Sequence, residues 1–113
     1  DFVRLVAPTT PTARMAEIAR HGRGFVYLIS RLGVTGEQDT LAATLPDTIA
    51  RLRATTPLPV CVGFGISRPD QAAAVARMAD GVVVGSALVR AADRSVDEAL
   101  ALAASLRQAI DDA

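Results

Sequence analysis

Four short apolar runs, each followed by a segment with helical periodicity, restrict the folds open to this chain more than any other feature. The predicted strands lie at residues 2–6, 25–30, 58–64 and 82–84. Strands that alternate with helices in this way predict a parallel sheet covered by helices, which is an α/β fold. The pattern permits either an open doubly wound sheet or part of a (βα)8 barrel. A length of 113 residues suits one domain, whereas a complete barrel needs roughly twice that length.

Capping residues and glycines predict where the helices of the first half begin and end. Thr10 is expected to cap a helix whose first residue is Pro11, and Gly22 is expected to end it. The polar stretch from Arg31 to Thr44 predicts a long loop, a kind of segment that is usually functional or mobile in a compact domain. A helix over residues 45–54 then leads to the third strand.

Capping boxes predict the starts of two later helices. Ser67 and Asp70 have the spacing of such a box, ahead of an alanine-rich helix that reaches about residue 79. Ser95 and Glu98 form a second box, which opens the final helix. One face of this final helix is expected to pack against the core and carries Val96, Leu100, Ala103, Leu106 and Ile110.

The charge and composition of the chain exclude several classes of function. Twelve arginines balance twelve acidic residues, so the net charge is zero and no global field attracts a nucleic-acid backbone or an anionic membrane. The chain has no lysine, which excludes a lysine Schiff base within it. The single cysteine, Cys61, lies in an apolar run and is expected to be a small buried hydrophobic residue. No apolar run reaches the roughly 20 residues of a membrane span.

Glycines gather where three of the four predicted strands end. Because ligands of parallel α/β proteins bind beyond the carboxyl ends of the strands, these glycines mark the candidate binding edge. Gly85 and Ser86 are expected at the start of a short helix, where free N–H groups and the helix dipole favour a phosphate group. A tight turn is the simpler interpretation of any one glycine, and no Walker motif or full dinucleotide fingerprint is present. The whole set favours phosphate binding and comprises Gly33, Gly36, Gly63, Gly65 and Gly85.

Other residues with possible chemistry give weaker signals. His21 lies beside a glycine near a helix end, where an interaction with the helix dipole explains it better than catalysis. Tyr27 lies on a core strand and either packs in the interior or points its hydroxyl toward a ligand, whereas Phe64 at a strand end suits flat apolar ligand contact. Glu37 and Asp39 fall in the predicted loop within possible reach of a ligand. No carboxylate falls in or just after a strand, so the sequence predicts a binding half without a general acid–base pair.

Several motifs in order along the chain resemble one known family. The run Leu-Val-Ala-Pro-Thr-Thr-Pro occupies residues 5–11, and Gly-Val-Thr-Gly occupies residues 33–36. Gly-Phe-Gly-Ile-Ser follows at residues 63–67, and Gly-Ser-Ala-Leu-Val at residues 85–89. Together they resemble the C-terminal half of the tryptophan synthase alpha chain, and the resemblance covers essentially the whole sequence.

This resemblance implies a fold and an activity. Residues 1–113 would form one partial TIM-barrel domain, strands 5–8 of a (βα)8 barrel with their helices, and no second domain. The family is a carbon–carbon lyase of tryptophan biosynthesis that cleaves indole-3-glycerol phosphate to indole and glyceraldehyde 3-phosphate in the cytoplasm. Its partner, the beta chain, uses pyridoxal phosphate, so no cofactor is expected in this chain. The pyridoxal lysine belongs to that partner, which agrees with the absence of lysine here.

The resemblance also assigns roles to individual residues. Thr35 and Gly36 match the mobile loop that closes over the site, and Arg31 matches a residue at the base of that loop. Tyr27 and Phe64 match positions that line the substrate pocket. The positions that hold the substrate phosphate in the family correspond to Gly36, Gly65, Gly85 and Ser86.

The chain departs from the family pattern in one respect. The family's two catalytic carboxylates belong to the N-terminal half of the barrel, so no catalytic residue is assigned here and the chain alone is expected to be inactive. It opens on a strand-like run without an initiating methionine, which suggests that its beginning is missing. Two alternatives stay open: a phosphate-binding half-barrel module that self-associates into a full barrel, and a different sugar-phosphate barrel enzyme.

Overall fold

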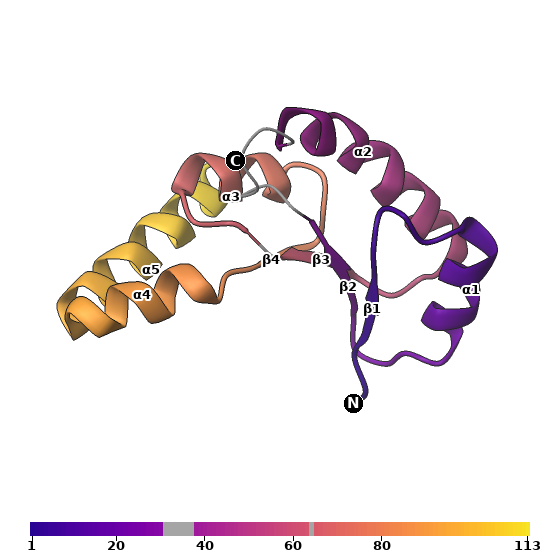
Figure 1. Ribbon diagram of the computed structural model, residues 1–113, viewed down its shortest axis with the longest axis horizontal. Coiled ribbons are helices and arrows are strands. Elements are labelled where there is room, and N and C mark those ends of the chain that lie inside the picture. The colour runs from indigo at the N-terminus through magenta and orange to yellow at the C-terminus, as the bar shows by residue number, and fades with distance from the viewer. Residues whose placement is uncertain (31–37, 64) are drawn as a thin grey trace.

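The computed structural model describes residues 1–30, 38–63 and 65–113, with only the backbone described over residues 38–43 (Figure 1). Strands and helices alternate along the chain, and two helices follow the last strand. In chain order the elements are β1 (Arg4–Val6), α1 (Thr12–Arg20), β2 (Val26–Ile29), α2 (Gln38–Thr55), β3 (Val60–Gly63), α3 (Pro69–Ala76), β4 (Gly81–Val83), α4 (Ser86–Arg94) and α5 (Val96–Asp111).

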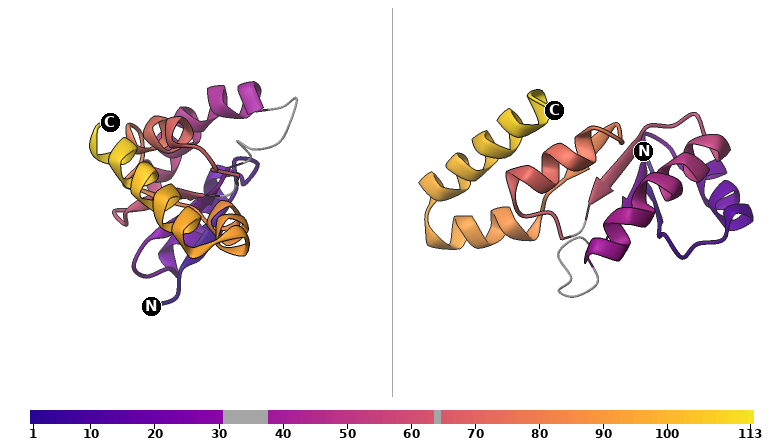
Figure 2. Two further views of the ribbon diagram at one scale, coloured as in Figure 1. Left: turned by 90° about the vertical axis from the view of Figure 1, so that its left-hand side faces the viewer. Right: turned by 90° about the horizontal axis from the view of Figure 1, so that it is seen from above.

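The four strands form one parallel sheet in the order β1-β2-β3-β4. Each strand therefore lies beside its neighbour in sequence, and the helix between them makes the crossover (Figure 2). This arrangement confirms the predicted fold class of four consecutive βα units in the α/β class. It also brings the carboxyl ends of all four strands to one edge of the sheet, which we call the carboxyl edge.

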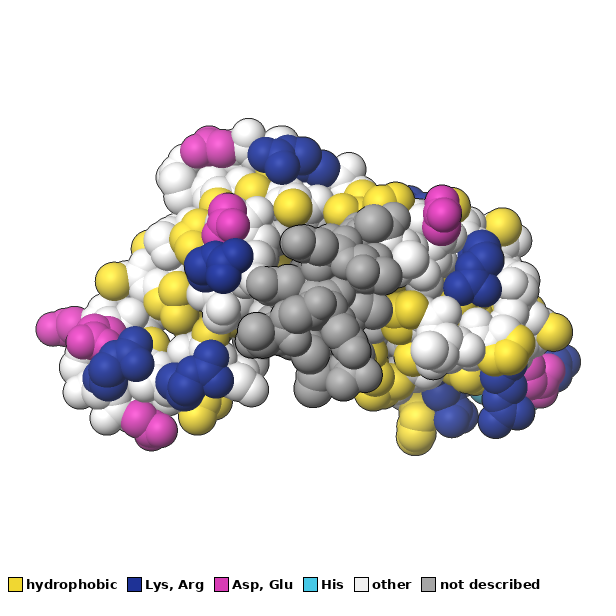
Figure 3. Space-filling view, turned by 45° about the horizontal axis from the view of Figure 1, so that its top comes forward, with side chains coloured by type: hydrophobic (Ala, Val, Ile, Leu, Met, Phe, Trp, Pro, Cys, Tyr) yellow, Lys and Arg dark blue, Asp and Glu magenta, His cyan; other side chains and the backbone are white. Residues whose placement is uncertain are grey.

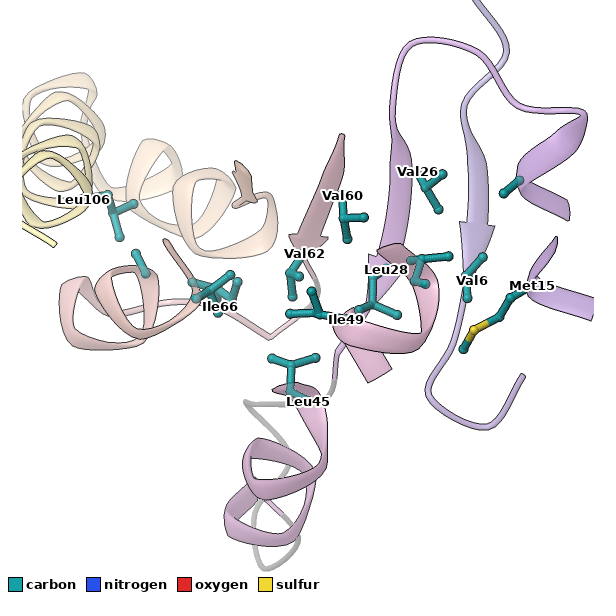
Figure 4. Close-up of a cluster of buried hydrophobic side chains, with 14 residues drawn as sticks. Val6, Met15, Val26, Leu28, Leu45, Ile49, Val60, Val62, Ile66 and Leu106 are labelled. Carbon is teal, nitrogen blue, oxygen red and sulfur yellow. The ribbon is translucent and has the colours of Figure 1, made fainter. Parts of the chain in front are cut away.

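The two faces of the sheet differ in burial. Val6, Leu28 and Val62 form one row across the strands, and each is buried in the core. Side chains from the helices, such as those of Met15 and Ile49, complete this core (Figure 4). Because side chains alternate along a strand, the next row points to the opposite face. We call this second surface the open face; its members are Leu5, Tyr27, Ile29, Cys61, Gly63, Gly81 and Val83.

The start of α1 corrects the prediction for Thr10. The helix begins at Thr12, and Pro11 is the N-cap residue rather than the first helical residue. Thr10 instead closes the turn before the helix: its Oγ1 accepts a hydrogen bond from the Ala7 N–H at 3.1 Å, and its own N–H donates to the Ala7 carbonyl at 2.9 Å. A threonine side chain that bonds backward in this way cannot also cap the helix that follows.

The predicted long loop is wrong over its second half. Helix α2 begins at Gln38, so residues 38–44 are helical rather than part of a loop. This segment is polar overall, but it contains leucine, alanine and glutamine, which have high helix propensity. Pro46 lies inside the helix, where it removes one backbone hydrogen bond without ending the element. The loop prediction relied on polarity, whereas the helix propensity of residues 38–44 favours the helix that the structure has.

The last two predicted caps gave different results. Ser95 does cap α5, because its Oγ accepts a hydrogen bond from the Glu98 N–H at 3.0 Å. The predicted box of Ser67 and Asp70 is wrong: α3 begins at Pro69 after the N-cap Arg68, and it ends at residue 76 rather than near residue 79. Asp70 forms an exposed ion pair with Arg68 at 3.0 Å.

The buried face of α5 also differs from the prediction. The predicted Leu106 is buried and the predicted Ile110 packs partly against the core, so the second half of the face is confirmed. Val96 and Leu100 are instead 72% and 63% exposed, and Leu102, which was not predicted, packs partly against the core. The helix packs against α3 and α4, and this contact selects a face rotated from the one that the first turn suggested. No helix within the described parts of the chain is long and apolar enough to cross a bilayer.

Candidate functional site

The carboxyl edge brings together those sequence-predicted site residues that the structure describes. Gly65 follows β3, and Gly85 with Ser86 follows β4, so both segments emerge at the same edge. Tyr27 lies on the neighbouring strand β2. The predicted residues that lie outside the described part of the chain are Arg31, Gly33, Thr35, Gly36, Glu37 and Phe64.

Gly65 adopts a backbone conformation that suits glycine. Its φ angle is +82°, in the left-handed region that a residue with a Cβ enters only at an energetic cost. The residue is exposed and leads through a buried Ile66 into helix α3. We call residues 65–68 the Gly65 turn. Gly65 itself is exposed and has no side chain, which leaves room for an anion close to its main chain.

Gln71 holds the far end of the Gly65 turn. Its side-chain carbonyl accepts hydrogen bonds from the backbone N–H groups of Ser67 at 2.9 Å and Arg68 at 3.1 Å. The Ser67 hydroxyl lies 3.4 Å from the same oxygen. Sequence reasoning selected Asp70 for this role and missed Gln71, although glutamine is common at the third position of a helix in a capping box. The spacing from Arg68 to Gln71 was the available signal.

Gly85 and Ser86 form the exposed beginning of α4. Gly85 is the N-cap residue, and nothing lies within 4 Å of the place that a Cβ on it would occupy. The first intrahelical bonds run from the N–H groups of Leu88 and Val89 to the Gly85 carbonyl, at 3.0 and 3.1 Å. The N–H groups of the first turn that precede them are the donors that a helix leaves for a capping group or an anion.

Tyr27 lies on the open face and leans toward the carboxyl edge. Its hydroxyl oxygen lies only 2.3 Å from the position that a Cβ on Gly63 would take, and its Cζ lies 2.7 Å from it. The half-buried ring therefore covers Gly63, the last residue of β3. This contact places the phenol on the face away from the helices, near the ends of the strands.

Ser30 joins the ends of β2 and β3 and was not identified from the sequence. Its N–H and its hydroxyl both donate to the Gly63 carbonyl, at 2.8 and 3.0 Å. The residue is only 3% exposed. A hydroxyl at the end of an otherwise apolar strand was the only sequence signal for it.

Cys61 lies on the open face as a half-buried residue, less buried than predicted. Its Sγ lies 2.7 Å from the place that a Cβ on Gly81 would occupy, so the thiol fills the space above that glycine. Burial, and to a lesser extent the negative charge of Asp80, raises the pKa of the Cys61 thiol. The group therefore stays protonated at neutral pH, which suits packing and not nucleophilic chemistry.

His21 lies at the amino end of the sheet, opposite the carboxyl edge. It is the C-cap residue of α1, and the chain then enters β2 from the amino side of the sheet. Its Nε2 lies 3.3 Å from the Glu17 carboxylate, which also pairs with Arg20. Hydrogen bonding to Arg20 is the main reason that the pKa of the exposed Glu17 carboxyl lies below its usual value. The expected helix-end setting of this histidine is confirmed.

The described part of the edge offers backbone donors at Gly65 and at the start of α4. None of the residues in the four strands is Asp or Glu. Among the described residues, no group of three or more His, Cys, Asp or Glu side chains could hold a metal ion. Arginine and acidic side chains are interspersed over the surface shown in Figure 3, as the neutral net charge implies. Chemically, this edge can bind an anion through its main chain.

Comparisons with known sequences give a consistent family. The family model described as "Tryptophan synthase alpha chain" matches residues 1–112. A tryptophan synthase alpha chain from Chloroflexus aggregans is 51% identical over 94 residues, which is 83% of this chain and 35% of the relative. One from Desulfatibacillum aliphaticivorans is 53% identical over 97 residues, which is 86% of this chain and 37% of the relative. The chain thus spans little more than a third of the length of these relatives.

Solved structures show the same partial match. A chain of Mycobacterium tuberculosis tryptophan synthase superposes with a TM-score of 0.82 at 39% identity, covering 96% of this chain and 41% of that one. Tryptophan synthase subunit alpha from Legionella pneumophila gives a TM-score of 0.73 at 37% identity, covering 98% of this chain and 42% of that one. The sheet of four parallel βα units is accordingly half of a TIM barrel.

Proposed function

This chain belongs to the tryptophan synthase alpha chain family, and from that premise we propose that it supplies the phosphate-binding part of an enzyme that cleaves indole-3-glycerol phosphate. The observation that carries the proposal is the carboxyl edge, where the Gly65 turn and the start of α4 come together. Residues 1–113 would act as one partial barrel domain. Because the chain spans about a third of its relatives, the activity belongs to a complete subunit.

The proposed phosphate site works through the main chain. Gly65 supports a close approach because it has no Cβ, and the first turn of α4 at Gly85 and Ser86 adds N–H donors and the positive end of a helix dipole. Gly36 is the fourth proposed contributor. A site of this kind needs no lysine, which fits a chain that has none.

The substrate's organic part is proposed to lie next to the open face. Tyr27 offers an aromatic surface there and covers the end of β3, which supports its assignment to the pocket. Phe64, Arg31 and Thr35 keep the roles assigned by resemblance: Phe64 lines the pocket, and the other two belong to the loop beside it.

Cleavage of the carbon–carbon bond requires proton transfers that we do not assign to this chain. General acid–base catalysis needs a titratable group within hydrogen-bond reach of the reacting atoms, and no strand residue here is acidic. We therefore propose that the two carboxylates come from the other half of the barrel. The proposed partner is a beta chain that carries pyridoxal phosphate, with no cofactor in this chain, and the proposed location is the cytoplasm.

A calorimetric and an enzymatic measurement together test this function. We expect the isolated chain to bind indole-3-glycerol phosphate, to bind free glycerol far more weakly, and to release no indole above background. Adding a separately produced first half of a relative's barrel is expected to restore indole release. Turnover by the isolated chain would contradict the assignment of catalysis to the other half, and equal affinity for glycerol would contradict the phosphate site.

A second candidate function is a binding module that self-associates, and the exposure of the open face favours it. Leu5 on this face is 56% exposed. The chain exposes 6642 Å², compared with about 5,900 Å² expected for a folded monomer of this size. The excess is comparable to the roughly 800 Å² that one partner buries in a standard interface. Sedimentation at several concentrations separates the candidates, because a stable dimer favours the module and a monomer at high concentration excludes it.

A further inference from the structure

We propose that Ser30 is a positioning residue for the Gly65 turn, acting through the carbonyl group of Gly63. The inference rests on the proposed phosphate site and adds a residue that neither the sequence motifs nor the family resemblance pointed to. Ser30 is the residue directly after β2, and Gly63 is the last residue of β3. The pair therefore links two neighbouring strand ends at the carboxyl edge.

Two hydrogen bonds from one residue meet at one acceptor. The Ser30 N–H donates to the Gly63 oxygen at 2.8 Å, as expected in a parallel ladder, and the Ser30 hydroxyl donates to the same oxygen at 3.0 Å. A carbonyl oxygen has two lone pairs, so both donors are accommodated. The backbone bond alone continues the sheet, whereas the hydroxyl bond restrains the direction of the carbonyl. At 3% exposure of Ser30, water is a poor competitor for that bond.

Gly63 is a residue whose direction needs such a restraint. The Tyr27 ring excludes a side chain at this position, since a Cβ would lie 2.3 Å from the phenol oxygen. The Tyr27 contact requires a glycine at position 63, and glycine has the widest conformational freedom of all residues. The backbone at this position is therefore less restrained than it would be with another residue. Gly63 comes two residues before Gly65, and the direction in which the chain leaves β3 limits where Gly65 can lie.

The Gly65 turn is then held from both sides. Gln71 fixes its exit through the N–H groups of Ser67 and Arg68, at 2.9 and 3.1 Å, and Ser30 fixes the strand end that precedes it. Binding of an anion by main-chain N–H groups depends on donors that already point to the right place. The hydroxyl of Ser30 is therefore expected to strengthen phosphate binding without touching the phosphate.

Two variants of Ser30 and one control test this role. Ser30→Ala removes the hydroxyl, and Ser30→Thr keeps one at the same position. Thr48→Val is the matched control, because Thr48 is another buried hydroxyl, 3% exposed, that donates to a backbone carbonyl, that of Thr44 at 3.1 Å, within α2. Each ¹⁵N-labelled chain is titrated with inorganic phosphate, amide exchange is followed at Gly65 and Ile66, and global stability is measured by urea unfolding.

We expect Ser30→Ala to weaken phosphate binding about fivefold and to speed amide exchange at Gly65 and Ile66 by a similar factor, as the loss of the hydroxyl bond to the Gly63 carbonyl implies. Ser30→Thr should restore most of both effects. Thr48→Val should change the urea midpoint without changing either. If Ser30→Ala matches the wild type in exchange at these two residues, the positioning role is wrong. If the wild type binds no phosphate but Ser30→Ala still loosens the turn, the proposed function fails and the positioning role stands.

Discussion

The carboxyl edge of the sheet exposes glycines and is held by the neutral side chains of Ser30 and Gln71, whereas a charged carboxylate, Asp80, holds the opposite, amino edge. At the amino edge, the Asp80 carboxylate accepts a hydrogen bond from the Val60 N–H at 2.8 Å and pairs with Arg53 at 3.2 Å. At the carboxyl edge, Gly65 and Gly85 leave the backbone exposed. Side chains secure the strands at both edges, and we propose that only the carboxyl edge, with its exposed glycines, also binds a ligand.

The largest effect is expected from a side chain at Gly63. Gly63→Ala places a Cβ 2.3 Å from the Tyr27 hydroxyl and 2.9 Å from the Val83 Cβ, so the ring and the strand must shift. Such overpacking costs about 3 kcal/mol of unfolding free energy, which urea denaturation measures. Adding Tyr27→Leu is expected to recover part of this loss. A Gly63→Ala variant as stable as the wild type would show that the ring does not occupy this space.

Replacing Asp80 at the amino edge is expected to lower the unfolding free energy of the chain. Asp80→Ala leaves the Val60 N–H without its side-chain acceptor and Arg53 without its pair, at a cost of about 2 kcal/mol. Asp70→Ala is the control, because Asp70 forms an exposed pair with Arg68 and its loss should cost less than about 1 kcal/mol. Urea unfolding distinguishes the two, and equal losses would remove the structural role given to the amino edge.

Two glycines with the same backbone conformation allow the edges to be compared directly. Gly65 at the carboxyl edge and Gly24 at the amino edge have φ angles of +82° and +84°. Replacing either by alanine is expected to cost about 1–2 kcal/mol of stability, because the strain is the same. Only Gly65→Ala should also weaken phosphate binding, as measured by calorimetry. An equal loss of affinity in Gly24→Ala would mean that strain alone, and not position, causes it.

The smallest effect is a pH dependence that arises at Cys61. Its thiol has a pKa raised above the ordinary value of 9.0 by burial and by Asp80. The folded state therefore holds the proton more tightly than the unfolded state does, so this contribution is full below about pH 9 and is lost as the pH rises through the folded pKa. The unfolding free energy of the wild type should fall more between pH 8 and pH 10 than that of Cys61→Ala. Parallel pH profiles would contradict this.

The sequence predicted the parallel sheet better than it predicted the local contacts. Apolar runs and glycines have a clear period and position, so four βα units were predictable, and the structure has them. The starts of α1 and α2 were not predicted correctly. Thr10 bonds to Ala7 instead of capping α1, and the polar residues that were expected to form a loop make the first turns of α2. The rotation of α5 depends on packing against α3 and α4, which a single helix does not reveal.

In the candidate site too, some residues could be predicted from the sequence and others could not. Glycine at a strand end is visible in a sequence, and Gly65 and Gly85 lie where expected. Ser30 and Gln71 act through hydrogen bonds to the backbone of other segments, so their importance depends on which strands and turns become neighbours. The sequence alone does not show which backbone group a serine hydroxyl or a glutamine amide will bond to.

The central claim, that the carboxyl edge binds phosphate, is tested most directly by titrating the ¹⁵N-labelled chain with inorganic phosphate. The account predicts saturable shifts of the amide signals of Gly65, Gly85 and Ser86. It predicts little change at Gly24 and Gly81, which lie at the amino edge. Shifts confined to the amino edge, or no saturable shift at Gly65 and Gly85, would contradict the claim.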